Sequence, residues 1–390
     1  MSTLNMFTPA FGGLPQVFFG RANEVSFIES AIENANSPHR AFFITGNRGC
    51  GKTTLLEKAS RLAREHGWLT VDVHSSHASQ SIIEALAGGT EKTTGKSLSP
   101  GAFGISVGSA ASSTRTEFSQ ASLGQLLIDT CGSLIAHRGV FITVDEIQKV
   151  PEQDAENLCS AVQLALRKGL PIMLALAGLP GSKEKVASYP GCTFMQRTYD
   201  MKIGCMQVDE TLDAFSFVFR KMPEYEVTDD ALWEAGFFSQ GYPYLMQLVG
   251  YYAVERASET LVAGSAAIDA VDIEAVEPVA LEAYRENVLN PILSGLSTSL
   301  SSYLEAMCDA QDAEGRVSSR SVAELMGKKP SQVSSYRQRL IDRRLIEPDG
   351  YGYARFLLPH IESFYRSETA ALDVKDPSQQ WNRVLNDQSN

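Results

Sequence analysis

The segment that most constrains the fold of this chain lies near its N-terminus and reads Gly46-Asn47-Arg48-Gly49-Cys50-Gly51-Lys52-Thr53. It matches the pattern G-x-x-x-x-G-K-[ST] of a phosphate-binding loop, or P-loop. Such a loop needs a buried strand before it and a helix after it. Residues 41–45 are apolar and β-favouring, and residues 54–66 carry apolar side chains at helical spacing. This context disfavours the alternative, a chance match in a glycine-containing loop.

Each residue type in the loop has a physical role. The glycines let the backbone curl so that its N–H groups point inward at a helix N-terminus, which attracts anions. Lys52 is predicted to reach the β- and γ-phosphates of a nucleotide, and the Thr53 hydroxyl to ligate Mg²⁺. The predicted nucleotide-binding residues are Gly46, Asn47, Arg48, Gly49, Cys50, Gly51, Lys52, Thr53 and Thr54.

A second motif supports the first. Residues 139–144 form an apolar strand that is followed directly by Asp145 and Glu146. This is the Walker B pattern, in which Asp145 holds Mg²⁺ opposite Thr53 and Glu146 polarises the attacking water. A strand with an acidic turn is the alternative, and Lys52 upstream favours the catalytic interpretation. We therefore predict ATP and Mg²⁺ as cofactors, ATP hydrolysis to ADP and phosphate as the activity, and Lys52 and Glu146 as catalytic residues.

Length and composition limit the remaining possibilities. A chain of 390 residues with 44% hydrophobic content can form two or three packed domains. Its net charge of −12 argues against a wholly basic nucleic-acid coat, but not against a local basic module. The six cysteines show neither zinc-binding spacing nor a disulfide framework. No signal peptide or membrane span is recognisable, so we expect a cytoplasmic protein without a membrane partner.

Strand and helix patterns alternate from about residue 41 to 206. They predict an α/β P-loop NTPase fold, with a mostly parallel sheet and helices on both faces, in a nucleotide-binding domain at residues 1–206. Residues 88–120 are rich in Gly, Ser and Thr and are predicted to be an insertion. Helical patterns at 210–222, 229–238, 244–257 and 268–288 predict a second, all-helical domain at residues 207–296.

The pattern changes again at residues 297–366. Helices are predicted at 300–310, 319–326 and 331–343. They are followed by the segment 345–350 and a strand pair at 351–357, which together give the plan of a winged helix-turn-helix. Residues 367–390 are predicted to form a loose tail. The predicted core of this module consists of Val322, Leu325, Val333, Leu340 and Leu345.

The same module carries a segregated basic charge. Residues 315–366 contain ten Lys and Arg against five Asp and Glu, a local charge of +5 that leaves −17 for the rest of the chain. Double-stranded DNA is therefore the predicted partner, and contact with proteins is the alternative. The predicted DNA contacts are Lys328, Lys329, Ser331, Gln332, Ser335, Arg337 and Arg355.

Together these motifs resemble the AAA+ ATPases of the origin-recognition/archaeal-ATPase type, a group bordering on the STAND P-loop NTPases. The segment Phe19-Gly20-Arg21 resembles the part of these proteins that helps to enclose the adenine. Gly241-Tyr242-Pro243 matches their Gly-x-Pro signature, in which the proline starts a helix facing the nucleotide. The resemblance implies that residues 207–296 are a helical lid and that Phe19, Gly20, Arg21 and Pro243 contact the cofactor. An ordinary helix start explains either segment equally simply.

The resemblance also implies a homo-oligomer. Arg197 precedes the predicted fifth strand at 199–206, where related proteins place an arginine that acts on the phosphate of a neighbouring subunit. The alternative is a solvated surface arginine. The chain departs from the group at Ala177-Gly178-Leu179-Pro180, which lacks the usual polar sensor residue, and no arginine follows Pro243 in the first turn.

Two functions follow from these observations. The leading prediction is an AAA+/STAND-type ATPase that couples ATP binding and hydrolysis to DNA binding through its winged helix. The missing sensor residues favour the alternative, a slow ATP/ADP-dependent regulatory or defence switch whose winged helix contacts proteins.

Overall fold

The computed structural model describes residues 5–10, 15–34, 37–73, 77–94, 120–134, 137–261 and 265–365. The chain divides into two compact units. The first, here called the sheet unit, comprises Asn23–Thr45 and Leu55–Lys202. The second, here called the helical unit, comprises Met1–Ala22, Gly46–Thr54 and Ile203–Asn390, and so includes the P-loop.

The sheet unit is built on five strands, β1 Ala41–Thr45, β2 Leu69–Val73, β3 Val140–Val144, β4 Ile172–Gly178 and β5 Tyr199–Lys202. Their order is β2-β3-β4-β1-β5, and every neighbouring pair is parallel. All residues of β1, β3 and β4 are buried, which explains their continuous apolar runs. The predicted parallel sheet is confirmed, although its fifth strand ends at Lys202 rather than at residue 206.

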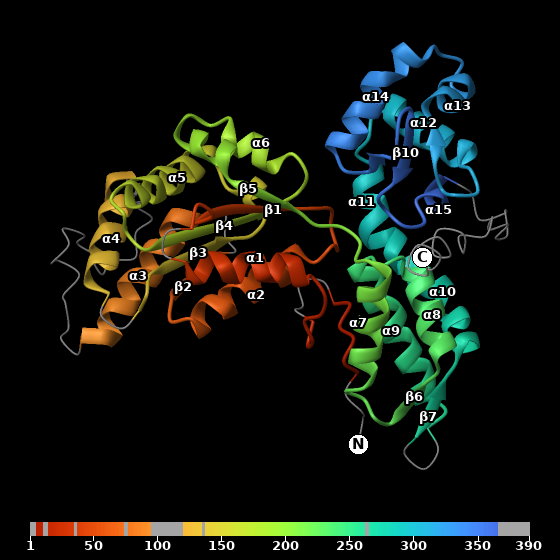
Figure 1. The fold of residues 1–390 in the computed structure, drawn as a ribbon, viewed down its shortest axis with the longest axis horizontal. Coiled ribbons are helices and arrows are strands. Elements are labelled where there is room, and N and C mark those ends of the chain that lie inside the picture. The colour runs from red at the N-terminus through yellow and green to blue at the C-terminus, as the bar shows by residue number, and fades with distance from the viewer. Residues whose placement is uncertain are drawn as a thin grey trace, which may run out of the picture. The chain divides into compact units, whose positions relative to one another are not determined.

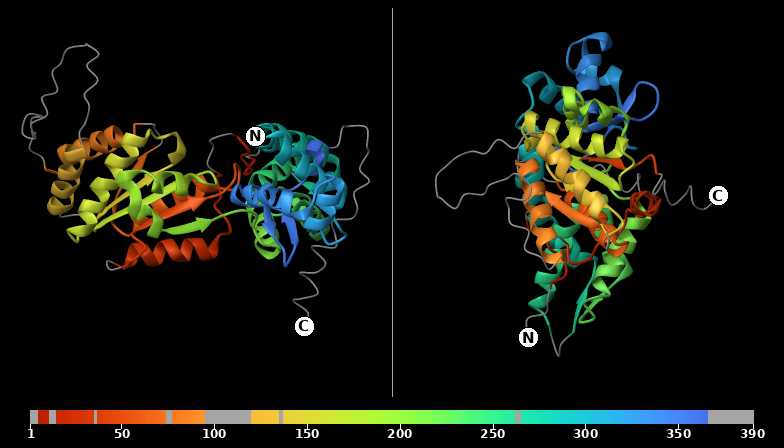
Figure 2. Two further views of the ribbon diagram at one scale, coloured as in Figure 1. Left: turned by 90° about the horizontal axis from the view of Figure 1, so that it is seen from above. Right: turned by 90° about the vertical axis from the view of Figure 1, so that its left-hand side faces the viewer.

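Helices cover both faces of this sheet (Figures 1 and 2). One face packs against α3 Ala78–Thr94, α4 Gln120–Ser133, α5 Glu152–Arg167 and α6 Ser182–Ala187. Helices α1 Ala22–Glu33 and α2 Lys52–Glu65 lie on the other face (Figure 1), where the rings of Phe27 and Phe42 are 6.0 Å apart. Helix α3 runs to Thr94, because helical hydrogen bonding continues past the Gly88-Gly89 pair at which we placed the start of the insertion. The remainder of the predicted insertion, residues 95–119, lies outside the described residues.

The helical unit begins with a set of helices after β5. These are α7 Val208–Phe219, α8 Asp229–Ser239, α9 Pro243–Ser258 and α10 Ala270–Tyr284, which continues through a π-helical turn η4 Arg285–Leu289 into α11 Asn290–Leu293. The prediction of an all-helical region is wrong in one respect: β6 Tyr225–Val227 and β7 Ala266–Ile268 form a short parallel pair. Three-residue strands are too short to give a period-2 signal.

The N-terminal segment belongs to this unit as well. The ring of Phe7 is buried and lies 5.1 Å from the ring of Phe219. A Cβ atom on Gly250 of α9 would come within 2.4 Å of the Phe7 ring, so the glycine makes room for it. No helix within the described residues is long and apolar enough to cross a membrane.

The last part of the helical unit, here called the C-terminal module, contains α12 Thr298–Ala310, β8 Val317–Ser318, α13 Ser319–Leu325, α14 Pro330–Asp342, β9 Ile346–Pro348, β10 Tyr353–Phe356 and α15 Glu362–Tyr365. Its strands form an antiparallel sheet in the order β8-β10-β9. Four of the five predicted core residues are buried, but Leu325 is 56% exposed, because it ends α13 beside an open hollow. The predicted tail at 367–390 lies outside the described residues.

Candidate nucleotide-binding site

The P-loop backbone requires its glycines. Gly49 and Gly51 have φ angles of +75° and +91°, in the region that favours glycine. A Cβ atom on Gly49 would also lie 2.8 Å from the Cβ of Tyr244, and one on Gly46 would lie 2.5 Å from the Cys50 sulfur. The motif therefore sets a loop shape that other residues at these positions would disrupt.

A loop that binds phosphates with its N–H groups must satisfy its carbonyl groups elsewhere. The Asn47 carbonyl accepts hydrogen bonds from Lys52 Nζ and from the Cys50 thiol, both at 2.9 Å. The Cys50 carbonyl accepts a hydrogen bond of 3.3 Å from the guanidinium of Arg21. Lys52 is buried at the start of α2, so its charge is held within the loop. Thr53 is exposed and Thr54 is half-buried on the same first turn.

The carbonyls of Arg48 and Gly49 accept hydrogen bonds from the segment that starts α9. The Tyr242 hydroxyl donates to the Arg48 carbonyl, and the Tyr244 backbone N–H donates to the Gly49 carbonyl at 3.1 Å. Pro243 occupies the first turn of α9, where the Tyr244 N–H has no partner within the helix. Burial raises the pKa of Tyr242 well above its ordinary value, so its hydroxyl stays protonated and can donate. The predicted Gly-x-Pro segment therefore contacts the P-loop through its tyrosines.

Within the Phe19-Gly20-Arg21 segment, Arg21 contacts the P-loop. The Arg21 side chain is buried, and its guanidinium bridges the carbonyls of Cys50 and Gly204. The Phe19 ring instead lies 5.4 Å from the ring of Phe217 on α7. Arg21 thus ties the P-loop to the segment that follows β5.

One further P-loop contact reaches the C-terminal module. Asn47 Nδ2 donates a hydrogen bond of 2.7 Å to the carbonyl of Arg344, directly after the C-cap of α14. Arg344 has a φ of +55°, the left-handed conformation that usually ends a helix at glycine, and Leu345 N–H closes the turn onto the Leu340 carbonyl at 3.0 Å. No sequence pattern predicts this contact, since 297 positions separate its two residues.

The acids of the Walker B motif lie in the sheet unit, at the end of β3. Asp145 is buried, and its Oδ1 accepts the backbone N–H of Glu146 at 2.8 Å. Glu146 has a φ of +51°, and its carboxylate is about one-third exposed. Its Oε2 lies 2.8 Å from Nε2 of Gln148 and 3.3 Å from Nζ of Lys149. The sequence motifs do not predict a role for Gln148, although it is a polar residue two positions after Glu146.

The sheet register explains why both motifs begin at one edge. β1 and β3 flank β4, with Thr45 paired to Gly178 and Val144 paired to Leu176. Because the strands are parallel, the carboxyl end of β1, which leads into the P-loop, and that of β3, which leads into Asp145, lie at the same edge of the sheet. Ligands of open α/β sheets bind outside this edge. Arg197 is exposed at the end of the 3₁₀ helix η3 Pro190–Arg197, immediately before β5.

The predicted DNA contacts fall into two groups. Lys328, Lys329, Ser331, Gln332 and Ser335 are exposed at or near the start of α14. Two arginines already bond within the module: Arg337 donates to the Tyr353 carbonyl of β10 at 2.8 Å, and Arg355 pairs with Glu347 at 2.6 Å. Arg337 therefore joins α14 to the β9–β10 hairpin.

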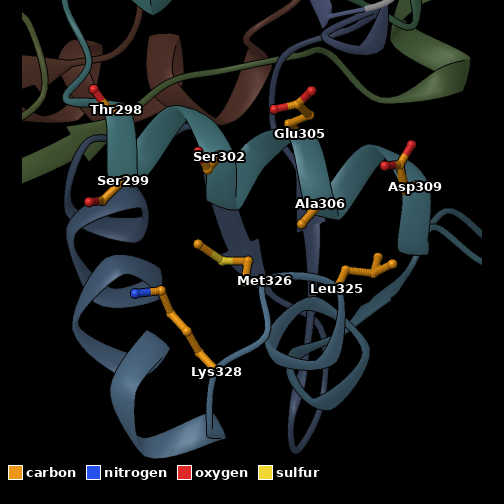
Figure 3. A pocket seen from close by; sticks show the side chains of 9 residues that line it. All are labelled: Thr298, Ser299, Ser302, Glu305, Ala306, Asp309, Leu325, Met326 and Lys328. Carbon is orange, nitrogen blue, oxygen red and sulfur yellow. The ribbon is translucent and has the colours of Figure 1, made fainter.

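A hollow of about 430 Å³ opens between α12 and the end of α13 (Figure 3). Leu325 and Met326 lie on the α13 side and Ala306 on the α12 side. The other lining residues are polar or charged: Thr298, Ser299, Ser302, Glu305, Asp309 and Lys328.

Comparison with known proteins gives two family matches. Residues 17–174 match the AAA ATPase domain, and residues 286–365 match a domain of unknown function (DUF8462). No curated protein is detectably similar in sequence to this chain.

Solved structures share the fold over nearly the whole chain. The chain is similar to a Walker-type ATPase of Pyrococcus abyssi (TM-score 0.63, 14% identity, covering 90% of this chain and 96% of that one). It is similar to the ORC2 protein of Aeropyrum pernix, solved in ADPNP–ADP complexes (TM-score 0.61, 14% identity, 98% of each chain). It is also similar to Cdc6p of Pyrobaculum aerophilum (TM-score 0.50, 15% identity, 98% of each chain). Residues 17–174 therefore match an AAA ATPase domain, which supports ATP hydrolysis, and the chain shares the fold of the ORC2 and Cdc6p proteins.

Proposed function

We propose that this protein couples ATP binding and hydrolysis to DNA binding through a C-terminal winged helix. The observation that carries the proposal is the hydrogen bond from Asn47 in the P-loop to the Arg344 carbonyl after α14. A P-loop that changes shape when it binds or releases phosphates pulls directly on the segment between α14 and β9. This contact gives nucleotide state a physical route to the proposed DNA-binding helix.

The proposed chemistry assigns one task to each group. Lys52 neutralises the β- and γ-phosphates, and the P-loop N–H groups hold them. The Thr53 hydroxyl and the Asp145 carboxylate are hard oxygen ligands of the kind that Mg²⁺ prefers, and Mg²⁺ would stabilise charge on the transferred phosphoryl group. Glu146 orients the attacking water and takes its proton. Arg21, Phe19, Gly20 and Pro243 complete the nucleotide site in this proposal.

The DNA-binding part rests on the order of elements and on charge. The order α12-β8-α13-α14-β9-β10 resembles that of a winged helix, which supports the proposal that α14 serves as the recognition helix and β9–β10 as the wing. The exposed side chains at the start of α14 would face a groove, and Lys328 and Lys329 would contact phosphates. The two arginines that bond within the module, Arg337 and Arg355, would contribute charge beside the same face.

We further propose that the enzyme acts as a homo-oligomer in which Arg197 of one subunit acts on the phosphate held by the next. Its exposure before β5 supports this role, since an arginine that serves a neighbour must be accessible. The proposed domain limits are 1–206 for the nucleotide domain, 207–296 for the lid and 297–366 for the winged helix.

A salt titration of duplex binding, with and without ATP, tests the proposal. Phosphate contacts give a linear fall of log K with log salt concentration, and the variant Lys328→Ala/Lys329→Ala should flatten the slope by about two units. The matched control is Arg167→Ala/Lys168→Ala, which removes two adjacent exposed charges at the end of α5 and should leave the slope unchanged. Binding that does not depend on salt, or a slope equally affected by both variants, would overturn the DNA-binding role.

The hollow beside α12 favours a second candidate function, a slow ATP/ADP switch whose C-terminal module contacts proteins. Its lining combines apolar Leu325 and Met326 with Glu305 and Asp309, whose carboxylates repel DNA phosphates. An exposed apolar surface with charged neighbours is typical of a protein contact. Absence of salt-sensitive duplex binding in the same titration would support this candidate.

A further inference from the structure

A single side chain joins the Walker B turn to the end of the neighbouring strand β4. Gln148 lies in the 3₁₀ turn η2 Ile147–Lys149. Its amide nitrogen donates to Glu146 Oε2 at 2.8 Å. Its amide oxygen accepts the backbone N–H of Leu179 and the hydroxyl of Ser182, both at 3.3 Å. One end of the amide therefore holds the carboxylate of Glu146, and the other end is fixed to the segment between β4 and α6.

The residue at the end of β4 leaves room for this amide. Gly178 has no side chain, and a Cβ atom there would lie 3.0 Å from the Gln148 amide oxygen and 2.7 Å from the Ser182 Cβ. Any larger residue at position 178 would therefore push the Gln148 amide away from Leu179 and Ser182. Both the glycine and the glutamine are needed for the observed bridge.

The chemistry of the two ends differs. A carboxylate accepts hydrogen bonds but cannot donate them, so a neutral amide N–H orients it without competing for a proton. The backbone of Glu146 is in a left-handed conformation, and this part of the chain is a tight turn. Without the amide, rotation about the Glu146 side-chain bonds would spread its carboxylate over several positions, which a step requiring an aligned water does not tolerate.

We propose that Gln148 is a positioning residue for ATP hydrolysis, which holds the Glu146 carboxylate against a fixed point at the β4–α6 junction. The inference rests on the proposed role of Glu146 as the group that activates water. Gln148 does not touch the nucleotide in this proposal, so it affects the hydrolysis step and leaves ATP affinity unchanged.

The central test is steady-state hydrolysis by Gln148→Ala. We expect kcat to fall about 10- to 100-fold, the usual loss for a residue that orients a functional ligand through hydrogen bonds, with KM for ATP within about twofold of the unmodified protein. The matched control is Gln153→Ala on α5, an exposed glutamine whose Nε2 donates to Asn157 Oδ1 at 3.3 Å, and it should keep full activity. Equal kcat values for Gln148→Ala and Gln153→Ala would overturn the proposal. A rise in KM for ATP as large as the fall in kcat of Gln148→Ala would also overturn it.

Two more variants separate the ends of the bridge. Gln148→Glu keeps acceptor oxygens for Leu179 and Ser182 but places a second carboxylate against Glu146, so at pH 8 it should be at least as impaired as Gln148→Ala. If it retains full activity, the contact with Glu146 is not the functional one. Ser182→Ala should reduce kcat severalfold alone and add nothing to Gln148→Ala, because both changes break one bridge. Additive losses would contradict the bridge.

Glu146→Gln, measured in parallel, separates a failure of the proposed role of Glu146 from a failure of the proposed role of Gln148. If that variant hydrolyses ATP normally, the proposed role of Glu146 fails. If it is inactive while Gln148→Ala is fully active, only the inference about Gln148 fails. Thermal melting of each variant shows whether a loss of kcat reflects misfolding, and an unchanged melting temperature with reduced kcat supports the positioning role.

Discussion

The P-loop and the Walker B turn begin at the same sheet edge, yet they are held in place in different ways. The carbonyls of residues 47–50 accept hydrogen bonds from inside the loop and from Arg21, Tyr242 and Tyr244, which lie far away in sequence. The Asp145 carboxylate accepts the N–H of Glu146, and the Glu146 carboxylate contacts the side chains of Gln148 and Lys149, which lie within three positions of it.

This difference separates binding from chemistry. The partners of the P-loop lie in the helical unit, so a change in that unit alters the loop that would hold the phosphates. The partners of Glu146 lie in the sheet unit and form a local arrangement. We therefore expect substitutions around the P-loop to change nucleotide affinity and its link to the C-terminal module, and substitutions around Glu146 to change turnover.

The largest expected effect comes from Arg197, and it shows whether hydrolysis needs an arginine from a neighbouring subunit. Arg197→Ala should reduce turnover about 10³-fold or more with nearly unchanged ATP affinity, because it would remove a charge supplied to a neighbouring subunit. Wild-type activity should then rise more than linearly with protein concentration. The control is Arg167→Ala, an exposed arginine on α5. A strictly linear dependence, with Arg197→Ala as active as the wild type, would indicate a monomeric switch.

The next effect addresses the Walker B turn directly. Glu146→Gln should preserve ATP binding and reduce phosphate release by about 10²-fold or more, since an amide keeps the shape of the side chain but cannot take a proton from water. Nucleotide binding measured by fluorescence and phosphate release measured on the same sample would show the split. Unaltered turnover removes Glu146 from the mechanism.

A third prediction concerns the P-loop, where a substitution should weaken ATP binding itself. Lys52→Ala should weaken ATP binding about 10²-fold or more, because it removes the buried cation that would pair with the phosphate oxygens in the proposed site. Isothermal calorimetry measures this affinity. The Asn47 carbonyl also loses one of its two donors, so the loop should become less ordered. An ATP affinity equal to that of the wild type would refute the assignment of Lys52.

The sequence predicted the parts of the site that depend on local pattern. The P-loop lies between a buried strand and a helix, and Asp145 follows a buried strand, because continuous apolar runs and glycine spacing specify these elements without tertiary contacts. Leu325 was wrongly placed in a core, since helical periodicity shows which residues share a face but not where the helix ends against its neighbours.

Contacts between distant segments could not be predicted in this way. Tyr242 was visible only as the middle residue of a Gly-x-Pro signature, and its hydroxyl reaches a carbonyl 194 positions away. The Asn47–Arg344 bond and the fit of Gln148 over Gly178 depend on packing of whole elements. Such contacts connect the motifs to one another, and we expect substitutions in them to have smaller effects than substitutions in the motifs themselves.

Tyr242→Phe tests the link between the P-loop and α9. Removing the hydroxyl leaves the Arg48 carbonyl without this donor, and a hydrogen bond of this kind contributes about 1 kcal/mol, or about fivefold in ATP affinity. Turnover at saturating ATP should stay near the wild-type value, because the Walker B turn is untouched. The control is Tyr251→Phe on the same helix, a half-buried tyrosine whose side chain makes a ring contact with Tyr252. A loss of turnover without a loss of affinity would show that the two regions are not separable.

The smallest expected effect concerns the contact between the P-loop and the C-terminal module. Asn47→Ala removes the amide that donates to the Arg344 carbonyl but keeps the Asn47 carbonyl that accepts from Lys52. ATP affinity without DNA should therefore change less than about twofold. In the wild type, ATP changes duplex affinity by some factor. In Asn47→Ala this factor should be about fivefold smaller, which corresponds to a loss of about 1 kcal/mol of coupling.

Reciprocity provides an internal check on that measurement. The effect of DNA on ATP affinity must shrink by the same factor as the effect of ATP on DNA affinity. Asn47→Asp is the isosteric companion: it also lacks the donor and turns a carboxylate oxygen toward the Arg344 carbonyl, so it should reduce the coupling at least as much. Coupling that survives both substitutions would mean that nucleotide state reaches α14 by another route, such as Tyr242 and α9, and the Asn47 contact would then serve only to hold the loop.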